Sequence, residues 1–213
     1  MNYVEQLNSS YSKPYLFSYR RCPYAMRARM ALVESKIEFD VYEISLRNKP
    51  QEMLLISPKG TVPILIFYEL VFDESLKIMK WAYQNSKSNQ SMSLKPEDNE
   101  VACELILMND GKFKESLDCY KYNERFPQKS KMEHRGDCCL FLEILEQRLM
   151  NMPFLMGNNR TFVDISIFPF VRQFANVDKE WFDNSKFTEV KKWLSKLTGS
   201  DLFRQIMKKP NFG

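Results

Sequence analysis

One cysteine in the N-terminal part of the chain stands in a setting suited to thiol chemistry. Cys22 lies in the stretch "YRRCPYAMRARMAL", with Arg20 and Arg21 before it, Pro23 after it and helical periodicity from there on. Proline suits the first position of a helix, because its missing N–H group would have no partner there. The N–H groups and the dipole of a helix start favour an anion. We therefore expect a lowered pKa for the Cys22 thiol, which would supply thiolate, the nucleophile of disulfide exchange.

The residues after Cys22 indicate which thiol chemistry the site could perform. A dithiol redox motif has a second cysteine three residues on, but Ala25 occupies that position. A mixed disulfide at Cys22 would have to be resolved by a thiol from outside, which favours glutathione-type over thioredoxin-type chemistry. The alternative is that Cys22 is a small buried hydrophobe without a reactive role. The other four cysteines lie in helical runs and are expected in the core.

Two further motifs could bind a ligand. In "KGTVPIL" (59–65), Pro63 opens an apolar strand, which implies an edge strand or a special turn. A cis bond between Val62 and Pro63 would offer the Val62 backbone to an extended peptide, whereas a trans bond at an edge strand would not. The sequence leaves both open. In "FDESLKI" (72–78), Ser75 is either a plain helix cap or part of a helix start that holds a carboxylate.

The elements that must position these motifs form a small α/β domain. Short apolar segments predict strands, and segments with helical periodicity predict helices: strands at 15–19, 39–44, 61–67 and 70–73, and helices at 23–35, 51–55 and 75–83. The first strand, helix and second strand suggest a parallel unit. The helix after Cys22 is expected to gather Met26, Met30 and Val33 on one face. Arg27 and Glu34 are expected on the opposite face.

The rest of the chain has the pattern of a linker followed by helices. Residues 84–98 are polar, have no aromatic residue and contain a proline, which is typical of a linker. Helical periodicity predicts six helices after it, at 99–109, 112–122, 132–150, 164–176, 186–198 and 200–208. We therefore expect an α/β domain over 1–83, a linker over 84–98 and an all-helical domain over 99–213.

Composition narrows the function classes. The 213 residues carry a net charge of only +4 without a run of five basic residues, so no nucleic-acid partner is expected. The start lacks the pattern of a secretion signal, and apolar runs such as "VPILIF" are too short for a membrane span. Five unevenly spaced cysteines favour reduced thiols and a cytoplasmic location. His134 and Cys138 share a helix face, but structural zinc needs four ligands, so no metal site is expected.

Together these motifs resemble the glutathione transferase superfamily, in particular its cysteine-type members of the omega and glutaredoxin-2-like groups and uncharacterised bacterial members. The matching order is CPYA after the first strand, Lys49 before the next helix, TVP before the third strand, and Glu74-Ser75 at the last helix. In the helical half, "NNRTFVDISIFPFVRQF" resembles a capping-box helix in which Thr161 pairs with Asp164, and "KWLSKLTGSDLFRQIM" resembles the usual end. The resemblance implies a thioredoxin-like α/β N-terminal domain and an all-α C-terminal domain.

The resemblance also implies a role for the residues around the thiol. Cys22 would face the sulfur of glutathione, and Tyr24 would line the same pocket. The Val62 backbone would pair with the cysteinyl part of the tripeptide, next to a cis Pro63.

Four other residues would hold the two ends of glutathione. Glu74 and Ser75 would bind the γ-glutamyl end, and Lys49 the glycyl carboxylate, with Lys59 as a weaker candidate. Physical chemistry agrees, because a peptide with two carboxylates and one amine would meet a lysine, a helix start and a carboxylate. One departure affects this end: the hairpin before Glu74 has Tyr-Glu at 68–69 where family members usually have a glycine.

The implied activity is glutathione-dependent thiol transfer or reduction. The Cys22 thiolate would attack a glutathione mixed disulfide or an oxidised small molecule such as dehydroascorbate, and a second glutathione would release the enzyme. Glutathione is thus the expected co-substrate, beside an unidentified disulfide or electrophile, and a homodimer is expected by analogy. The alternative is a non-catalytic binding module on the same fold, acting through protein partners.

Overall fold

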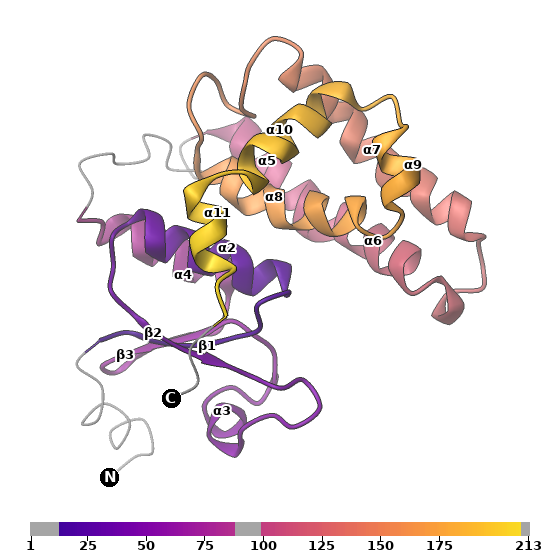
Figure 1. Cartoon of the computed structure of the whole chain (residues 1–213). Coiled ribbons are helices and arrows are strands. Elements are labelled where there is room, and N and C mark those ends of the chain that lie inside the picture. The colour runs from indigo at the N-terminus through magenta and orange to yellow at the C-terminus, as the bar shows by residue number, and fades with distance from the viewer. Residues whose placement is uncertain (1–12, 88–98, 210–213) are drawn as a thin grey trace. The chain divides into compact units, whose positions relative to one another are not determined.

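The computed structural model describes residues 13–87 and 99–209, which belong to two compact units (Figure 1). The first unit contains the chain up to Ser91 together with the segment from Asp201 onwards. The second unit contains the chain from Met92 to Ser200. The fold class is the one expected: a thioredoxin-like α/β domain and a helical domain.

A four-stranded mixed sheet forms the centre of the first unit. Its strands are β1 (Tyr15–Ser18), β2 (Asp40–Glu43), β3 (Ile64–Phe67) and β4 (Leu70–Phe72), in the order β2-β1-β3-β4. Strands β1 and β2 are parallel, with Tyr15 opposite Asp40, which confirms the expected parallel unit. Strand β3 is antiparallel to both β1 and β4. Each strand lies inside the segment that predicted it.

The hairpin between β3 and β4 is regular despite its lack of glycine. Phe67 pairs with Leu70, so only residues 68–69 form the loop. Tyr68 takes the left-handed conformation, with a φ of 51°, at the position where such a loop normally favours glycine. The hairpin therefore keeps a two-residue turn, and Tyr68 bears the local backbone strain.

Three helices of the first unit lie around the sheet, and a fourth comes from the C-terminal part of the chain. They are α2 (Pro23–Glu34), α3 (Gln51–Ile56), α4 (Ser75–Gln84) and α11 (Asp201–Ile206). Helices α2 and α4 pack closely together, and α11 packs on α2 although about 170 residues separate them in sequence (Figure 1). The expected boundaries assigned this last helix to the helical domain, but it packs on α2 and belongs to the first unit.

The second unit consists of helices. They are α5 (Glu100–Met108), α6 (Lys114–Lys121), α7 (Lys131–Leu149), α8 (Phe162–Ala175), α9 (Lys179–Asp183) and α10 (Thr188–Thr198), with a π-helical turn at Asn109–Phe113 and a 3-10 turn at Asn123–Arg125. Helix α8 is the core element, since nearly all of its side chains are buried. The sequence did not predict α9, because five residues make little more than one turn and show no periodicity.

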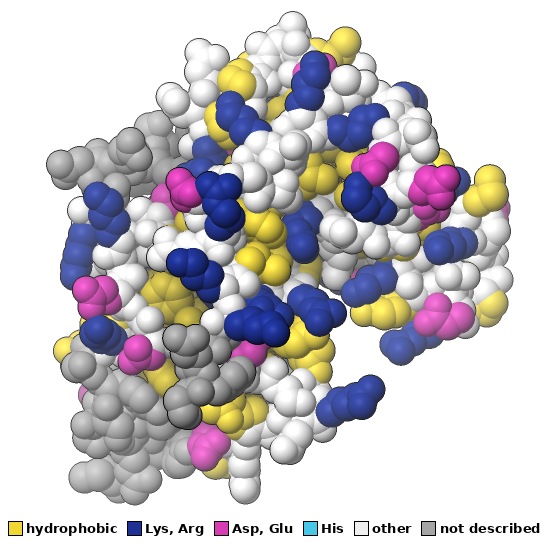
Figure 2. Space-filling model, viewed as in Figure 1, with side chains coloured by type: hydrophobic (Ala, Val, Ile, Leu, Met, Phe, Trp, Pro, Cys, Tyr) yellow, Lys and Arg dark blue, Asp and Glu magenta, His cyan; other side chains and the backbone are white. Residues whose placement is uncertain are grey.

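The surface is polar and of mixed charge. On the face seen in Figure 2, Lys and Arg side chains are spread among acidic and apolar ones and form no single stripe. Across the described residues, no helix combines the length and the apolar character that a membrane span requires.

Candidate functional site

Cys22 stands at the junction of β1 and α2, where the sequence places it. It is the residue before the helix, with Pro23 at the first helical position, and its side chain makes no capping hydrogen bond to α2. The backbone N–H of Cys22 donates to the Tyr19 carbonyl over 2.9 Å, which closes the turn before the helix. The residue is half-buried, so part of it remains open to solvent.

The loop before β3 lies against this thiol. The Cys22 Sγ donates to the Val62 carbonyl oxygen over 3.7 Å, and the bond between Val62 and Pro63 is cis. The cis form decides between the two readings that the sequence left open. Val62 and Pro63 are both buried. The structure therefore brings together the cysteine, the valine carbonyl and the proline, three of the residues singled out by motif.

Lys49 reaches the same loop through its contact with Gly60. This glycine has a φ of +60°, and a Cβ built on it would lie 3.1 Å from Leu54 Cδ2 and 3.5 Å from Lys49 Nζ. The positive φ thus favours glycine, and a side chain there would also push the Leu54 side chain aside by a few tenths of an ångström. The Lys49 ammonium consequently lies near Gly60, in the segment that leads into Val62.

Ser75 is fixed by a buried arginine that the sequence pattern misplaced. Arg27 was expected on the polar face of its helix, but its side chain is only 1% exposed. Its Nε donates to Ser75 Oγ over 3.0 Å, and its guanidinium lies 5.2 Å from the centre of the Tyr24 ring. The expectation was wrong because α4 covers this face of α2. Arg27 ties the helix that follows Cys22 to the start of α4.

Lys59 lies at the Glu74 end of the site. Its ammonium is 2.6 Å from Glu74 Oε1 and 3.0 Å from Asp73 Oδ2, and Ser57 Oγ donates to the same Asp73 oxygen over 3.3 Å. The hydrogen bond from Lys59 holds the pKa of Asp73 below its usual value. The sequence suggested Lys59 as a second choice for the glycyl carboxylate, but in the structure its charge faces the residues at the start of α4.

A second buried arginine, which the sequence analysis did not single out, holds the turn before Cys22. Arg29 Nη1 donates to Ser18 Oγ and to the Tyr19 carbonyl, and Nη2 donates to the Arg20 carbonyl over 2.8 Å. Burial lowers the pKa of Arg29 to about 10, although the nearby Glu43 and Cys22 partly oppose this shift. A sequence signal existed: Arg29 is four residues after the buried Ala25, and thus on the same helix face.

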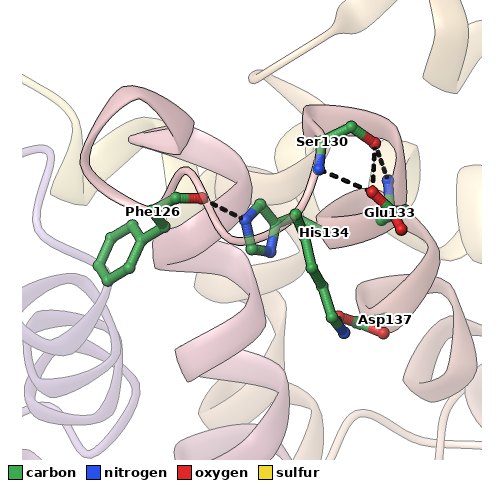
Figure 3. A network of polar contacts seen from close by, with 6 residues as sticks. Phe126, Ser130, Glu133, His134 and Asp137 are labelled. Carbon is green, nitrogen blue, oxygen red and sulfur yellow. Dashed lines mark hydrogen bonds and ion pairs between the residues drawn. The ribbon is translucent and has the colours of Figure 1, made fainter.

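His134 lies outside this group and has a structural role. Its ring Nε2 donates to the Phe126 carbonyl over 3.0 Å, and the preceding residues Ser130 and Glu133 close the start of α7 with a capping box (Figure 3). Cys138, on the same helix, is buried. Among the residues that the structure describes, no three His, Cys, Asp or Glu side chains are grouped so as to hold a metal ion.

The pair expected at the start of the helix beginning near residue 162 is present. Asp164 Oδ2 accepts hydrogen bonds from the backbone N–H and the hydroxyl of Thr161, at 2.8 and 2.9 Å. Its Oδ1 accepts from the Leu155 N–H and from Trp193 Nε1, at 3.0 and 2.8 Å. The carboxyl is fully buried, and this burial raises its pKa against the effect of the hydrogen bonds. The capping box predicted from sequence is thus confirmed as part of the helical core.

Two family models match the chain, in the order of its two units. The glutathione S-transferase N-terminal domain matches residues 16–90, and the glutathione S-transferase C-terminal domain matches residues 109–201. Together these segments cover most of the chain. The chain belongs to the glutathione S-transferase superfamily.

Individual relatives are distant. Glutathione S-transferase U28 of Arabidopsis thaliana is 26% identical over 173 residues, which cover 79% of this chain and 75% of the relative. Probable glutathione S-transferase DHAR2, chloroplastic, of Oryza sativa subsp. japonica is 25% identical over 185 residues, which cover 85% of this chain and 64% of the relative. A solved glutathione transferase family member from Pseudomonas fluorescens pf-5, with two glutathione molecules bound, superimposes with a TM-score of 0.81 at 18% identity, over 98% of this chain and 99% of that one. At this identity the likeness shows the fold.

Proposed function

We propose that this protein is a glutathione-dependent thiol transferase or reductase of the cysteine type, and that Cys22 is its nucleophile. The observation that carries the proposal is the position of the thiol. Cys22 begins α2 and lies 3.7 Å from the Val62 carbonyl, beside the cis Pro63, in a chain of the glutathione S-transferase superfamily. A relative named as a probable DHAR-type transferase supports the reductase side of the proposal.

The reaction consists of two thiol–disulfide exchanges. The Cys22 thiolate attacks the glutathione sulfur of a mixed disulfide, a sulfur–sulfur bond forms, and the other thiol leaves as a thiolate that takes a proton from water. A second glutathione thiolate then attacks the glutathione sulfur bound to Cys22, which releases glutathione disulfide and restores the enzyme thiolate. In sum, the mixed disulfide and one glutathione thiol give glutathione disulfide and the free substrate thiol, and the enzyme thiolate is regenerated.

The residues around the thiol would hold glutathione as an extended peptide. The Val62 backbone would pair with its cysteinyl part, and Tyr24 would line the pocket next to Cys22. Lys49 would bind the glycyl carboxylate by charge. At the other end, the Glu74 carboxylate would meet the amine, while Ser75 and the first N–H groups of α4 would meet the γ-glutamyl carboxylate.

Two broader features belong to the same proposal. All five cysteines are free thiols, which suits a protein of the reducing cytoplasm. We also propose that the protein acts as a homodimer and belongs with the omega and glutaredoxin-2-like groups and their bacterial members.

The experiment that tests the proposal measures the intact mass of the protein after incubation with glutathione disulfide across a range of pH. We expect one glutathione adduct per chain in the wild type and none in Cys22→Ala. The matched control is Cys119→Ala, which removes another half-buried thiol and should leave the adduct in place. An adduct that persists in Cys22→Ala, or a wild type that forms none below neutral pH, would contradict the proposal and favour a non-catalytic binding module.

A further inference from the structure

We propose that Arg29 is a positioning residue for Cys22: it fixes the turn that presents the thiol, and its buried charge favours the thiolate. The inference rests on the proposed function in one respect, which is that Cys22 is the reacting group. It goes beyond that function because neither the motifs nor the resemblance assigns a role to Arg29.

The first support is the number of groups that one guanidinium holds. Arg29 donates to the Ser18 hydroxyl and to the carbonyls of Tyr19 and Arg20, so it binds three consecutive residues at the end of β1. The Tyr19 carbonyl also accepts the N–H of Cys22. The position of the thiol is therefore set by a carbonyl that Arg29 itself holds.

The same turn is fixed from its other side. The backbone N–H of Arg20 donates to Glu43 Oε1 over 2.7 Å, at the end of β2. The segment from Ser18 to Cys22 thus lies between a carboxylate on the sheet and a guanidinium on α2. With both hydrogen-bonding partners present, the turn has little freedom to move the thiol relative to the helix start.

The second support is the lack of a complete partner for the Arg29 charge. Its side chain is 4% exposed, and its Nε, which is buried, has no hydrogen-bond partner. No ion pair to Arg29 is found within residues 13–87 and 99–209. The charge of Glu43 acts on Arg29 from nearby, but the guanidinium itself is hydrogen-bonded to neutral carbonyls and a hydroxyl. Such a buried cation also stabilises other nearby anions, because the surroundings screen charge poorly.

Several groups around Cys22 influence the balance between thiol and thiolate. The Val62 carbonyl, which accepts from Sγ, favours the protonated thiol, because the contact needs the S–H proton. The helix start and Arg29 favour the thiolate. The charged residues on the surrounding elements are of both signs: Arg20 on the turn, Arg29 on α2, Glu43 on β2, Lys49 against the loop before Val62, and the Lys59–Glu74 pair at α4.

A purely structural role for Arg29 makes a different prediction from a positioning role. If the residue only stabilised the fold, its loss would lower stability and leave the ionisation of Cys22 in the folded protein unchanged. If it acts on the thiol, its loss moves that ionisation. The discriminating measurement is therefore the pH dependence of Cys22 reactivity, which needs neither glutathione nor a known substrate.

The experiment follows the rate of iodoacetamide alkylation at Cys22 against pH, with the modified peptide identified by mass, in Arg29→Met and the milder Arg29→Gln. We expect the midpoint of the curve of alkylation rate against pH to rise by about one pH unit or more, because an opposite charge near the ionising thiol has been removed. Arg29→Lys, which keeps the positive charge, should bring the midpoint most of the way back to the wild-type value. If Arg29→Met does not fold, the same measurement on Arg29→Gln tests the proposal.

The matched control is Arg27→Met, which removes a buried guanidinium two residues earlier on the same helix, whose Nε donates to Ser75 Oγ. We expect it to leave the alkylation midpoint in place. The proposal is overturned if the Arg29 variants titrate like the wild type, or if Arg27→Met shifts the midpoint equally. If the proposed function is wrong, the result is different: glutathione disulfide does not modify Cys22 in the wild-type protein.

Discussion

Helix α2 begins after Cys22, whose side chain makes no capping hydrogen bond, whereas helix α8 begins after Thr161, next to a carboxylate that closes the helix start. In α8, Asp164 uses both of its oxygens, and its four donors come from three parts of the second unit. In α2, the residue that corresponds to Thr161 is Cys22, a half-buried thiol beside a backbone carbonyl. A helix start whose polar groups are satisfied within the fold contributes stability. One that is left without a side-chain cap can serve an external anion.

Four further helices show the same contrast, whereas α6 and α10 of the second unit also begin without a side-chain cap from the preceding residue. In the first unit, Glu74 precedes α4 and its side chain makes no capping hydrogen bond. In the second unit, side chains cap three further helix starts: Asn99 at α5, Ser130 at α7 and Asp178 at α9. Four of the predicted glutathione contacts, Cys22, Tyr24, Glu74 and Ser75, therefore lie at two helix starts of the first unit that their own preceding residues do not cap.

The largest effect is expected from Cys22→Ser, which keeps the size of the side chain and removes the nucleophile. An alcohol does not form a disulfide, so thiol transfer should fall below detection while the unfolding midpoint stays close to that of the wild type. Turnover of a small mixed disulfide, followed by release of glutathione disulfide, is the measurement. Cys103→Ser is the control, and measurable activity in Cys22→Ser would mean that the start of α2 is not the reactive one.

Asp164→Ala should produce the largest loss of stability. The substitution leaves the buried donors of Leu155, Thr161 and Trp193 without their acceptor, so we expect the free energy of unfolding to fall by about 3 kcal/mol or more. Asp164→Asn keeps one carbonyl oxygen and should cost less. Urea unfolding followed by tryptophan fluorescence measures both. If Asp164→Ala lowered the free energy of unfolding no more than the loss of an exposed helix cap does, the contrast between α8 and α2 would be refuted.

Gly60→Ala should affect both the fold and the site of the first unit. Its positive φ and the contact with Leu54 predict a destabilisation of about 1–2 kcal/mol, and strain in the loop before Val62 should weaken glutathione binding. Thermal unfolding and a calorimetric titration with glutathione measure the two effects. Gly136→Ala is the opposite control: nothing lies within 4 Å of the added methyl group, and alanine in the middle of α7 should stabilise by about 0.5–1 kcal/mol. Equal effects at the two glycines would contradict this reading.

The smallest effect concerns the buried thiol of the second unit. Burial raises the pKa of Cys138, so this thiol stays protonated in the folded protein where the unfolded chain has already ionised. Stability should therefore decline as the pH rises above the ordinary thiol pKa of about 8.5. Urea unfolding at pH 7.5 and 9.5 measures the decline, which should be smaller in Cys138→Ala. Native alkylation near neutral pH should modify Cys22 before Cys138; the reverse order would refute the contrast between the two thiols.

Local signals predicted much of the fold and the centre of the site. The apolar segments around Phe17 and Leu65 gave the strands, and the run after Pro23 gave the helix, because periodicity reports directly which residues face a core. Thr161 and Asp164 were predicted correctly because a capping box lies within one turn of chain. Short-range chemistry of this kind needs no knowledge of the remaining molecule.

Other features had no local signal. The sequence placed Arg27 on the polar face of its helix, and only the packing of α4 on α2 shows that this side chain is buried and bound to Ser75. It left the Val62–Pro63 bond open, and it gave no indication that Lys59 lies against Glu74. Each of these depends on residues that are distant in sequence and meet only in the folded chain.

The sequence by itself determined that a thiol stands at a helix start, followed by proline and without a second cysteine, in a chain with a thioredoxin-like domain and a helical domain. Only the tertiary structure decided what lies beside that thiol: the Val62 carbonyl, and the turn before Cys22 that the Arg29 guanidinium holds. The physical reason is that the burial of a charged side chain depends on which element covers it. Periodicity can place Arg29 on the same helix face as a buried alanine, but it does not show which groups the guanidinium binds there, and packing decides that.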